Sequence, residues 1–255
     1  MKYDIIIIGS GPGGYVTAIR ASQLGFKVAV VEKENLGGIC LNWGCIPTKA
    51  LLKSAQVYDY LKHVDEYGLK AKEIDKDFSA VVQRSRNVAD GMSKGVQFLM
   101  KKNKIDVLNG YGTIKPGKKV IVADDKGKTE EYNADYIIIA TGARSRELPF
   151  LPIDGKKVIG YREAMTLPKQ PEKMIVVGSG AIGVEFAYFY KAMGTDVTIV
   201  EFLPNLVPLE DEDVSKQFER SFKKSGIKVM TSSSVTSVDT SGKGCLLYTS
   251  PSPRD

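Results

Sequence analysis

Cys40 and Cys45 are the residues of this chain whose type and spacing best suit redox chemistry, since only four residues separate them. Two cysteines can form a disulfide when the chain between them bends enough to bring their Cα atoms within about 4.4–6.8 Å. Gly44 supplies backbone freedom beside Cys45, and a helix that begins near Pro47 would present free N–H groups that favour a thiolate. The segment 37–50 is therefore a candidate for cycling between disulfide and dithiol.

Spacing alone leaves two other interpretations of these cysteines open. They could be two free cysteines buried side by side, because spacing alone does not distinguish such cysteines from a redox pair. A metal site needs further ligands, and the chain offers only Cys245 and His63 besides the pair. We therefore expect no metal. We expect His63, which falls in a polar stretch between two predicted helices, to lie on the surface.

The composition indicates a globular protein with a full core. The chain has 255 residues, 43% of them hydrophobic and 26% charged, which suits one large domain or two ordinary ones. The net charge of +6 comes from 36 basic and 30 acidic residues that are interspersed, so we expect no nucleic-acid partner. The apolar run at residues 5–8 is too short for a signal peptide or a membrane span. We therefore expect no membrane partner and a cytoplasmic location, where a disulfide is usually catalytic.

A dinucleotide-binding pattern opens the chain. Residues 4–8 are a β-branched run typical of a parallel strand buried on both faces. A glycine-rich turn follows at residues 9–14, then a predicted helix over 15–24 and a predicted strand over 27–31 that ends in Glu32. Strand, turn, helix, strand and acidic residue make a βαβ unit with a dinucleotide fingerprint.

Each part of the fingerprint has a physical role. Gly9 permits a tight turn, Gly11 lets the backbone approach a pyrophosphate, and Gly14 allows close packing of helix on strand. The helix N-terminus stabilises phosphate groups, and Glu32 can accept hydrogen bonds from the hydroxyls of a ribose.

The same pattern occurs a second time. A strand is predicted over residues 173–177, a second G-x-G-x-x-G occupies 178–183, a helix is predicted over 184–193, and a strand over 196–200 ends in Glu201. Two complete fingerprints indicate two dinucleotides. An acidic residue at position 201 would accept from a free 2′-hydroxyl and repel a 2′-phosphate, which favours NAD over NADP. The alternative is that Glu201 simply ends an exposed strand.

The region between the fingerprints changes character twice. Residues 47–62 and 78–102 predict helices. Residues 105–132 predict a small antiparallel meander of short strands, and 136–140 a strand that returns to the parallel sheet. A turn-rich stretch at 147–152 then predicts a domain boundary.

The last part of the chain breaks this regularity. Residues 211–224 predict a helix and 227–230 a strand, but residues 245–255 show no periodicity and end without completing a unit. Their letters match the translation of a transposase-type sequencing adapter, so we expect this tail to be non-native. The predicted domains are 1–147, which carries the dithiol, an incomplete 148–244, and the tail.

Together these motifs resemble the pyridine nucleotide-disulfide oxidoreductases from residue 2 to about residue 238. The most specific piece is Gly-Gly-Ile-Cys-Leu-Asn-Trp-Gly-Cys-Ile-Pro-Thr-Lys. It resembles the branch of the family that acts on lipoamide more than the glutathione or mercuric reductases. The pieces 140–142, 178–185 and 201–204 agree with this resemblance.

The resemblance implies an α/β fold with two Rossmann-like dinucleotide-binding domains and a small antiparallel β-meander. Domain 1–147 would bind FAD and domain 148–244 would bind NAD. The C-terminal interface domain of the family would be missing, and with it the histidine that serves the partner subunit's dithiol as a base. We therefore expect the chain to be truncated and to be inactive alone.

The resemblance also assigns roles to individual residues. The expected FAD-binding residues are Gly9, Gly11, Pro12, Gly14, Glu32, Lys49, Gly112, Thr141, Gly142 and Ala143. The expected NAD-binding residues are Gly178, Gly180, Ile182, Gly183, Glu185, Glu201 and Val235. The expected catalytic residues are Cys40, which exchanges with substrate, Cys45, which lies against the flavin, and Lys49 paired with Glu185.

The implied activity is FAD-dependent oxidation of dihydrolipoamide to lipoamide, with reduction of NAD through the Cys40–Cys45 disulfide. The implied partners are dihydrolipoamide on the acyltransferase of a 2-oxoacid dehydrogenase complex or on a glycine cleavage carrier protein, and a second copy of the full-length parent in a homodimer. Two alternatives remain: a flavin disulfide reductase with another substrate, such as glutathione or a mercuric ion, and a non-catalytic nucleotide-binding fragment.

Overall fold

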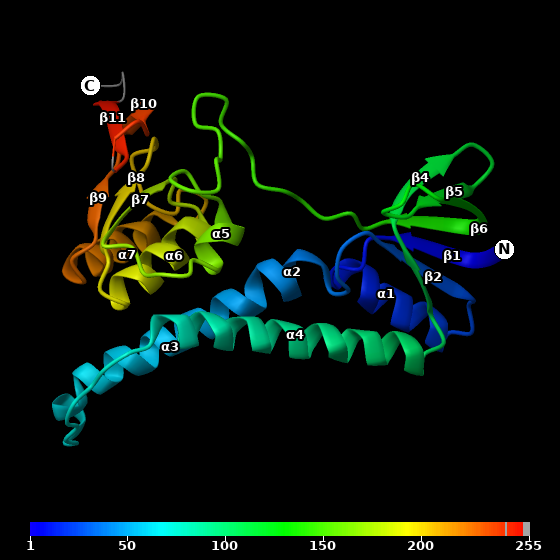
Figure 1. The fold of residues 1–255 in the computed structure, drawn as a ribbon, viewed down its shortest axis with the longest axis horizontal. Coiled ribbons are helices and arrows are strands. Elements are labelled where there is room, and N and C mark those ends of the chain that lie inside the picture. The colour runs from blue at the N-terminus through cyan, green and yellow to red at the C-terminus, as the bar shows by residue number, and fades with distance from the viewer. Residues whose placement is uncertain (243, 252–255) are drawn as a thin grey trace. The chain divides into compact units, whose positions relative to one another are not determined.

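A six-stranded sheet forms the centre of the first half of the protein, in a computed structural model that describes residues 1–242 and 244–251 (Figure 1). The strand order is β3-β2-β1-β6-β5-β4. β1 pairs in parallel with β2 and β6, and β2 with β3, whereas β4, β5 and the start of β6 are antiparallel. The strands are β1 (Lys2–Ile8), β2 (Val28–Glu32), β3 (Asp106–Asn109), β4 (Tyr111–Lys115), β5 (Lys119–Ala123) and β6 (Thr129–Ile139). The predicted α/β class is confirmed.

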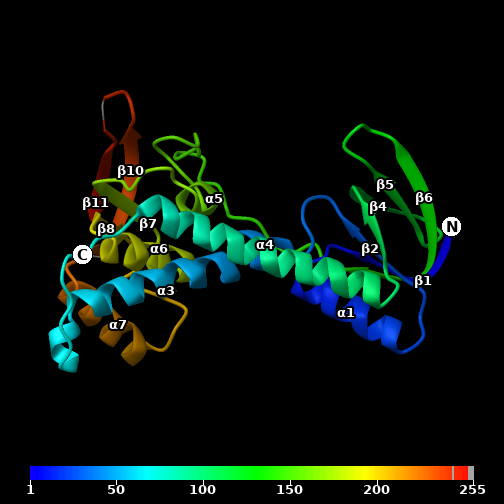
Figure 2. The same cartoon turned by 60° about the horizontal axis from the view of Figure 1, so that its bottom comes forward.

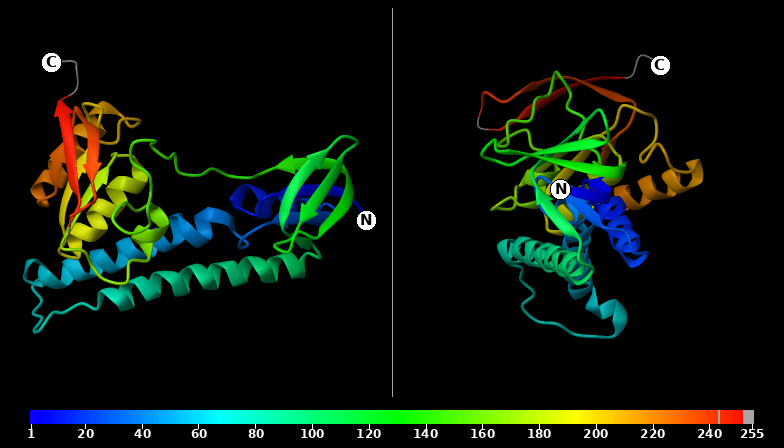
Figure 3. Two further views of the ribbon diagram at one scale, coloured as in Figure 1. Left: turned by 45° about the horizontal axis from the view of Figure 1, so that its top comes forward. Right: turned by 90° about the vertical axis from the view of Figure 1, so that its right-hand side faces the viewer.

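The isoleucine run of β1 supplies two hydrophobic layers, because side chains along a strand alternate between the faces of the sheet. Ile5 and Ile7 point into a layer shared with α1 (Pro12–Gln23) and the second half of α4 (Phe78–Lys102). Those two helices run alongside one another in Figure 2. Ile6 and Ile8 point into a second layer with Val120 and Val122 of the meander, whose strands are seen together in Figure 3. Each buried isoleucine stabilises the fold by about 1.5–3 kcal/mol.

β6 differs from the prediction because it is one continuous strand. Its first part pairs antiparallel with β5 and its later part, from Asn133, pairs in parallel with β1. The separate strand predicted at 136–140 is therefore the end of a longer one. The predicted meander over 105–132 is also too long, since β3 pairs in parallel with β2 and belongs to the parallel part of the sheet.

The helices begin earlier than predicted. α1 begins at Pro12 and α6 (Ala181–Ala192) at Ala181, because the third glycine of each fingerprint lies inside the first helical turn. A short helix, α2 (Gly38–Trp43), was not predicted, and α3 (Cys45–Lys62) begins two residues ahead of Pro47. α4 has the predicted limits. A 3₁₀ turn, η1 (Val64–Tyr67), follows α3, and exposed His63 lies between them.

A second, three-stranded parallel sheet carries the second fingerprint. Its order is β7-β8-β9, with α6 and α7 packed on it. β10 and β11 form a separate antiparallel pair. Phe78 lies 6.0 Å from the rings of both Phe189 and Tyr190, so the start of α4 shares a core with α6. The remaining elements are α5 (Tyr161–Met165), β7 (Lys173–Val177), β8 (Asp196–Val200), α7 (Glu212–Lys224), β9 (Lys228–Met230), β10 (Ser233–Asp239) and β11 (Leu246–Pro251).

The chain divides into two compact units that are each built from two segments. The first unit consists of Met1–Pro47 and Ser85–Arg144, and the second consists of Thr48–Arg84 and the residues from Ser145 onward. The domain borders expected from the sequence, and the non-native origin of residues 245–255, stay predictions. Part of that tail, residues 252–255, lies outside the described residues. Among the described helices, none combines the length and the apolar character needed to cross a membrane.

Gly14→Ala tests how tightly the first helix packs on the turn before it. A Cβ on Gly14 would lie 1.9 Å from the carbonyl oxygen of Gly9, so backbone must shift. We expect the variant to lose about 1–3 kcal/mol of unfolding free energy, the usual cost of overpacking. Gly13→Ala is the matched control, because nothing lies within 4 Å of its added Cβ. Urea unfolding followed by fluorescence of Trp43, the single tryptophan, measures both, and equal midpoints would contradict the packing argument.

Candidate cofactor and dithiol sites

The first glycine turn is closed by contacts between backbone atoms. Gly9 has a φ of 101° and its Cβ, if present, would lie 2.2 Å from the carbonyl oxygen of Ala140 at the end of β6. Gly14 donates its N–H to the carbonyl of Gly11 at 2.8 Å. Gly11 is the N-cap of α1 and offers no side chain to its free N–H groups, which remain available for a phosphate. Pro12 takes the first helical position.

Glu32 is held beside this turn by a buried serine. Ser10 is fully buried and donates to Glu32 Oε2 from its N–H at 3.0 Å and from its Oγ at 2.6 Å. The N–H of Glu34 donates to Oε1 at 2.9 Å. A carboxylate has about four acceptor positions, so three donors leave one for a ligand hydroxyl.

The second fingerprint repeats this arrangement. Ser179 is fully buried and donates to Glu201 Oε2 from its N–H and its Oγ, each at 2.7 Å, and the N–H of Leu203 donates to Oε1 at 2.8 Å. A Cβ on Gly183 would lie 2.4 Å from the carbonyl oxygen of Gly178, which has a φ of 96°. Gly180 is the N-cap of α6, again without a side-chain cap. Glu201 directly follows the last residue of its strand, Val200, but it is only 7% exposed, so the alternative of an exposed strand end is wrong.

Both turns therefore meet the physical requirements of a dinucleotide. Each combines a glycine turn that a side chain would fill, a helix N-terminus with free donors, and an oriented carboxylate with spare acceptor capacity. The residues present thus fit one adenine dinucleotide at each fingerprint.

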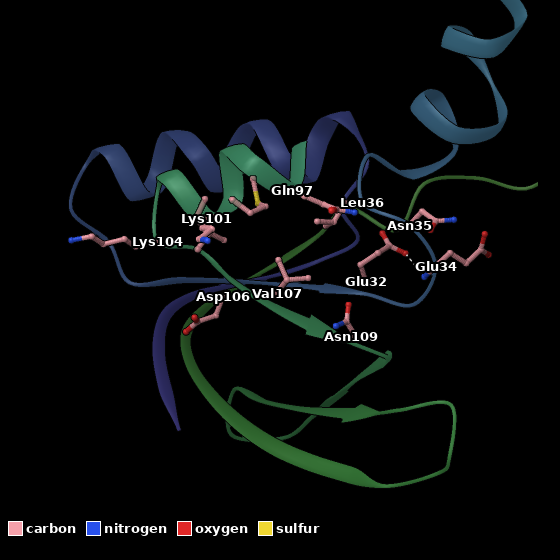
Figure 4. Close-up of a pocket in the computed structure, with 12 residues that line it drawn as sticks. Glu32, Glu34, Asn35, Leu36, Gln97, Lys101, Lys104, Asp106, Val107 and Asn109 are labelled. Carbon is pink, nitrogen blue, oxygen red and sulfur yellow. Dashed lines mark hydrogen bonds between the residues drawn. The ribbon is translucent and has the colours of Figure 1, made fainter. Parts of the chain in front are cut away.

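A cavity of about 590 Å³ opens beside Glu32 in the first unit (Figure 4). Figure 4 shows Glu32, Glu34 and Asn35 near one end of it and Lys101 and Lys104 near the other. Its volume is in the usual range of small-molecule pockets. It therefore adds a hollow beside the carboxylate that closes the first fingerprint.

The other residues expected at the cofactors are spread over several elements. Gly112 on β4 packs against Ile8 and Val31, with an added Cβ 3.2 Å from Val31 Cγ1. Thr141, Gly142 and Ala143 are exposed and follow β6, just after the residue that Gly9 approaches. In the second unit, Ile182 is an exposed residue of the first turn of α6, and Val235 lies on β10. β10 starts beside the second carboxylate, since the N–H of Ser233 donates to the Glu201 carbonyl at 2.9 Å.

The two cysteines lie on different helices that meet at one glycine. Cys40 is in α2 and packs partly buried against the core, whereas Cys45 is the exposed first residue of α3. Both thiols are free. A Cβ on Gly44, between the helices, would lie 3.1 Å from the Ile39 carbonyl oxygen and 3.4 Å from Cys40 Cα. A glycine is therefore what lets the chain double back close to Cys40.

The two thiols influence each other electrically. Burial, followed by the hydrogen bond to Cys45 and the charge of Cys45, raises the pKa of the Cys40 thiol to about 11. At neutral pH Cys40 therefore keeps its proton. The pKa of Cys40 therefore depends on Cys45, while the role of the two cysteines as a redox pair stays a prediction.

The segment that carries the cysteines is fixed to the first glycine turn. Gly37 donates its N–H to the Ser10 carbonyl at 3.1 Å, and a Cβ on Gly38 would lie 2.7 Å from Gly11 Cα. Asn42 Nδ2 donates to the carbonyl of Leu36 at 3.0 Å and to that of Gly38 at 2.9 Å. The dithiol and the first dinucleotide turn are thus parts of one continuous structure.

Lys49 and Glu185 form an ion pair inside the second unit. Lys49 lies on α3, four residues after Cys45, and Glu185 lies on α6. The Lys49 side chain is 63% exposed and that of Glu185 28%, so solvent screens the pair. The predicted pairing of these two side chains is present, while their catalytic role stays a prediction.

Several residues that hold the site were not predicted from the sequence. Ser10 and Ser179 orient the two carboxylates, and the signal for them was a serine at the same place in both fingerprints. Ser93 Oγ donates to the Leu36 carbonyl at 2.9 Å, and Arg86 contacts the residues between the cysteines. No local pattern marked these two. Within the described chain, no group of three or more histidine, cysteine or acidic residues could hold a metal ion.

Alkylation of Cys40 over a range of pH tests the coupling of the two thiols. Because the thiolate is the reactive form and the pKa of Cys40 is raised to about 11, we expect its rate with iodoacetamide to increase up to that pH. Cys45→Ala removes the partner's hydrogen bond and charge but leaves the burial, so the midpoint should fall and yet stay above the ordinary cysteine range. Peptide mass spectrometry in a Cys245→Ser background measures both. A midpoint unchanged by Cys45→Ala would show that the thiols are not coupled.

Comparison with known proteins gives a consistent result. The sequence profile described as pyridine nucleotide-disulphide oxidoreductase matches residues 3–250. A dihydrolipoyl dehydrogenase of Rhizobium etli is 50% identical over 253 residues, covering 93% of this chain and 53% of that protein. A protein of the same name from Zymomonas mobilis is 46% identical over 242 residues, covering 95% of this chain and 52% of that protein.

Solved structures agree with the sequence relatives. LpdA of Mycobacterium tuberculosis superposes with a TM-score of 0.88 at 27% identity, covering 98% of this chain and 55% of that one. The HOCl-induced flavoprotein disulfide reductase RclA of Escherichia coli, in its Cu(II) complex, has a TM-score of 0.82 at 26% identity, covering 97% and 55%. The chain therefore spans about half the length of the relatives it matches.

Proposed function

This chain belongs to the pyridine nucleotide-disulphide oxidoreductases, and we propose that it serves FAD-dependent oxidation of dihydrolipoamide to lipoamide with reduction of NAD. Proteins of this family are oxidoreductases that use FAD and NAD. The observation that carries the proposal is the attachment of the Cys40–Cys45 segment to the first glycine turn through Gly37 and Gly38. The sequence relatives, named dihydrolipoyl dehydrogenase, support the choice of substrate.

The first unit would hold FAD with its glycine turn and Glu32. The free N–H groups of α1 would bind the pyrophosphate and the spare acceptor position of Glu32 would bind a ribose hydroxyl. The loop Thr141–Ala143 beside Gly9 would add backbone contacts. When bound, FAD supplies the chemistry that links thiol–disulfide exchange, which uses thiolates, to hydride transfer, which uses a nicotinamide.

The dithiol would exchange with substrate in two steps. A thiolate of dihydrolipoamide attacks the Cys40 sulfur of the Cys40–Cys45 disulfide, and Cys45 leaves as a thiolate. The second thiolate of the substrate then attacks the substrate sulfur of the mixed disulfide, which closes lipoamide and releases Cys40. Substrate loses two electrons and the cysteine pair gains them. The raised pKa of Cys40 suits this product, because the Cys40 thiolate released in the second step takes up a proton at neutral pH.

The second unit would hold NAD in the same manner. Glu201, oriented by Ser179, would accept from the free 2′-hydroxyl of the adenosine ribose and would repel a 2′-phosphate. Gly178, Gly180 and Gly183 would leave room for the pyrophosphate, with Val235 near the adenine. Lys49 and Glu185, which pair with each other, would serve as further catalytic residues.

The proposed partners follow from the substrate. Dihydrolipoamide would be presented on an acyltransferase of a 2-oxoacid dehydrogenase complex or on a glycine cleavage carrier protein, and the full-length parent would be a homodimer. We also propose a cytoplasmic location, where the surroundings keep thiols reduced and a disulfide is usually catalytic.

The proposal is tested by counting thiols in the purified Cys245→Ser chain. We expect one FAD to bind per chain, an oxidised form with Cys40 joined to Cys45, and reduction of that disulfide by dihydrolipoamide, seen as two new alkylated cysteines by mass spectrometry. Cys45→Ala is the control that can form no such disulfide. Equal reduction by glutathione would favour another disulfide reductase. FAD binding without a Cys40–Cys45 disulfide would leave only a nucleotide-binding module.

A crossed pair of variants tests the assignment of the two carboxylates. Because each carboxylate belongs to one turn, Glu201→Gln should weaken NADH binding while FAD binding stays unchanged, and Glu32→Gln should do the reverse. A hydrogen bond to a charged group is worth about 1.5–3 kcal/mol, so each loss should be about tenfold or more. Glu201→Gln should also narrow the preference for NADH over NADPH. Fluorescence titration measures all of these constants, and equal effects on both cofactors would contradict the assignment.

A further inference from the structure

Arg86 contacts the two residues that stand midway between the cysteines. It lies half-buried on α4 within the first unit. Its guanidinium carbon is 4.6 Å from the centre of the Trp43 ring, and its Nη2 donates to the carbonyl of Asn42. Both contacts fall on the stretch that joins Cys40 to Cys45.

The position of this guanidinium suits the end of α2. Asn42 is in the last turn of that helix, where carbonyl groups lack helical partners and a cation is favourable. Burial lowers the pKa of Arg86, which shows that the contact costs desolvation, but an arginine remains charged at neutral pH. The planar guanidinium of Arg86 stacks on the indole of Trp43 and also donates to the Asn42 carbonyl. These two contacts together fix both the position and the orientation of the last turn of α2.

Two further contacts fix the other end of the same segment. Ser93, also on α4, donates to the Leu36 carbonyl at 2.9 Å, and Asn42 Nδ2 donates to that same carbonyl at 3.0 Å. α4 therefore holds the segment both ahead of Cys40 and after it. Arg86 supplies the contacts from α4 to the stretch 41–44, which includes the flexible Gly44.

We propose that Arg86 is a positioning residue that sets the dithiol–disulfide equilibrium of Cys40 and Cys45. Closing a disulfide depends on the effective concentration of one thiol at the other, which falls when the connecting chain is free to move. By fixing residues 42 and 43, Arg86 keeps the thiols close and favours the disulfide. This inference rests on the proposed function, in which these two cysteines are the redox pair.

The test compares Arg86→Met with Arg84→Met in the full chain with Cys245→Ser. Arg84 is a matched control on the same helix, since it also donates to a backbone carbonyl, that of Ala50 on α3 at 2.8 Å, but beyond the cysteines. Each protein is equilibrated with mixtures of reduced and oxidised dithiothreitol, quenched in acid and alkylated, and mass spectrometry counts the thiols. We expect Arg86→Met to lower the equilibrium constant for disulfide formation about tenfold, or about 30 mV, and Arg84→Met to leave it unchanged.

The outcomes separate this inference from the proposed function. If the parent chain forms no Cys40–Cys45 disulfide under any mixture, the proposed function fails. If the parent forms it and Arg86→Met gives the same equilibrium constant, or if Arg84→Met shifts it equally, Arg86 has no positioning role. Should Arg86→Met fail to fold by circular dichroism, Arg86→Lys replaces it, with a shift of about threefold expected because the charged donor remains but the planar group is lost. An unshifted Arg86→Lys overturns the inference.

Discussion

The arrangement of the first unit depends on a contact between two backbones that leaves no space for a side chain. A Cβ on Gly14 would lie 1.9 Å from the carbonyl oxygen of Gly9. Because this position is glycine, α1 starts directly on the turn and its N-terminus opens beside the end of β1. Ser10 is then buried under the turn, where it orients Glu32 and accepts the N–H of Gly37. The cysteine segment starts from there, so both the Glu32 carboxylate and the dithiol take their positions from one close approach.

The second unit shows that the same constraint operates without a cysteine segment beside it. Gly183 and Gly178 make the same close approach, and Ser179 and Glu201 make the same hydrogen bonds. In the first copy, the N–H beside the serine hydroxyl belongs to Gly37, which leads into α2 and Cys40. In the second copy, the N–H of Val207 takes that place, 3.2 Å from Ser179 Oγ. The glycine turn with its carboxylate and the cysteine segment are thus separable features, and only the first copy combines them.

Local patterns predicted the parts of this protein that local physics decides. The β-branched run at residues 4–8, the glycine spacings and the limits of α4 all follow from periodicity and backbone freedom, and the structure agrees with them.

Long-range pairing between strands was not predictable in the same way. β3 has only four residues, and its composition does not show that it joins the parallel sheet. No local pattern shows that β6 pairs first with an antiparallel neighbour and then with a parallel one. The six-residue α2 was missed because it has no capping side chain and is less than two turns long, too short for an apolar pattern to repeat. Arg86 was missed because its partners are distant in the chain.

The pairing of β1 with β6 also bears on how the chain folds as it leaves the ribosome. Tyr3 pairs in register with Ala134, so the isoleucines of β1 gain their second neighbour only after the whole intervening chain has been translated. Synthesis adds about 5–20 residues per second, so that edge stays open for many seconds. A β-branched, uncharged run with one free edge is the kind of segment that associates with other chains. The nascent protein therefore passes through an interval in which the isoleucine run of β1 can pair on one edge only, with β2.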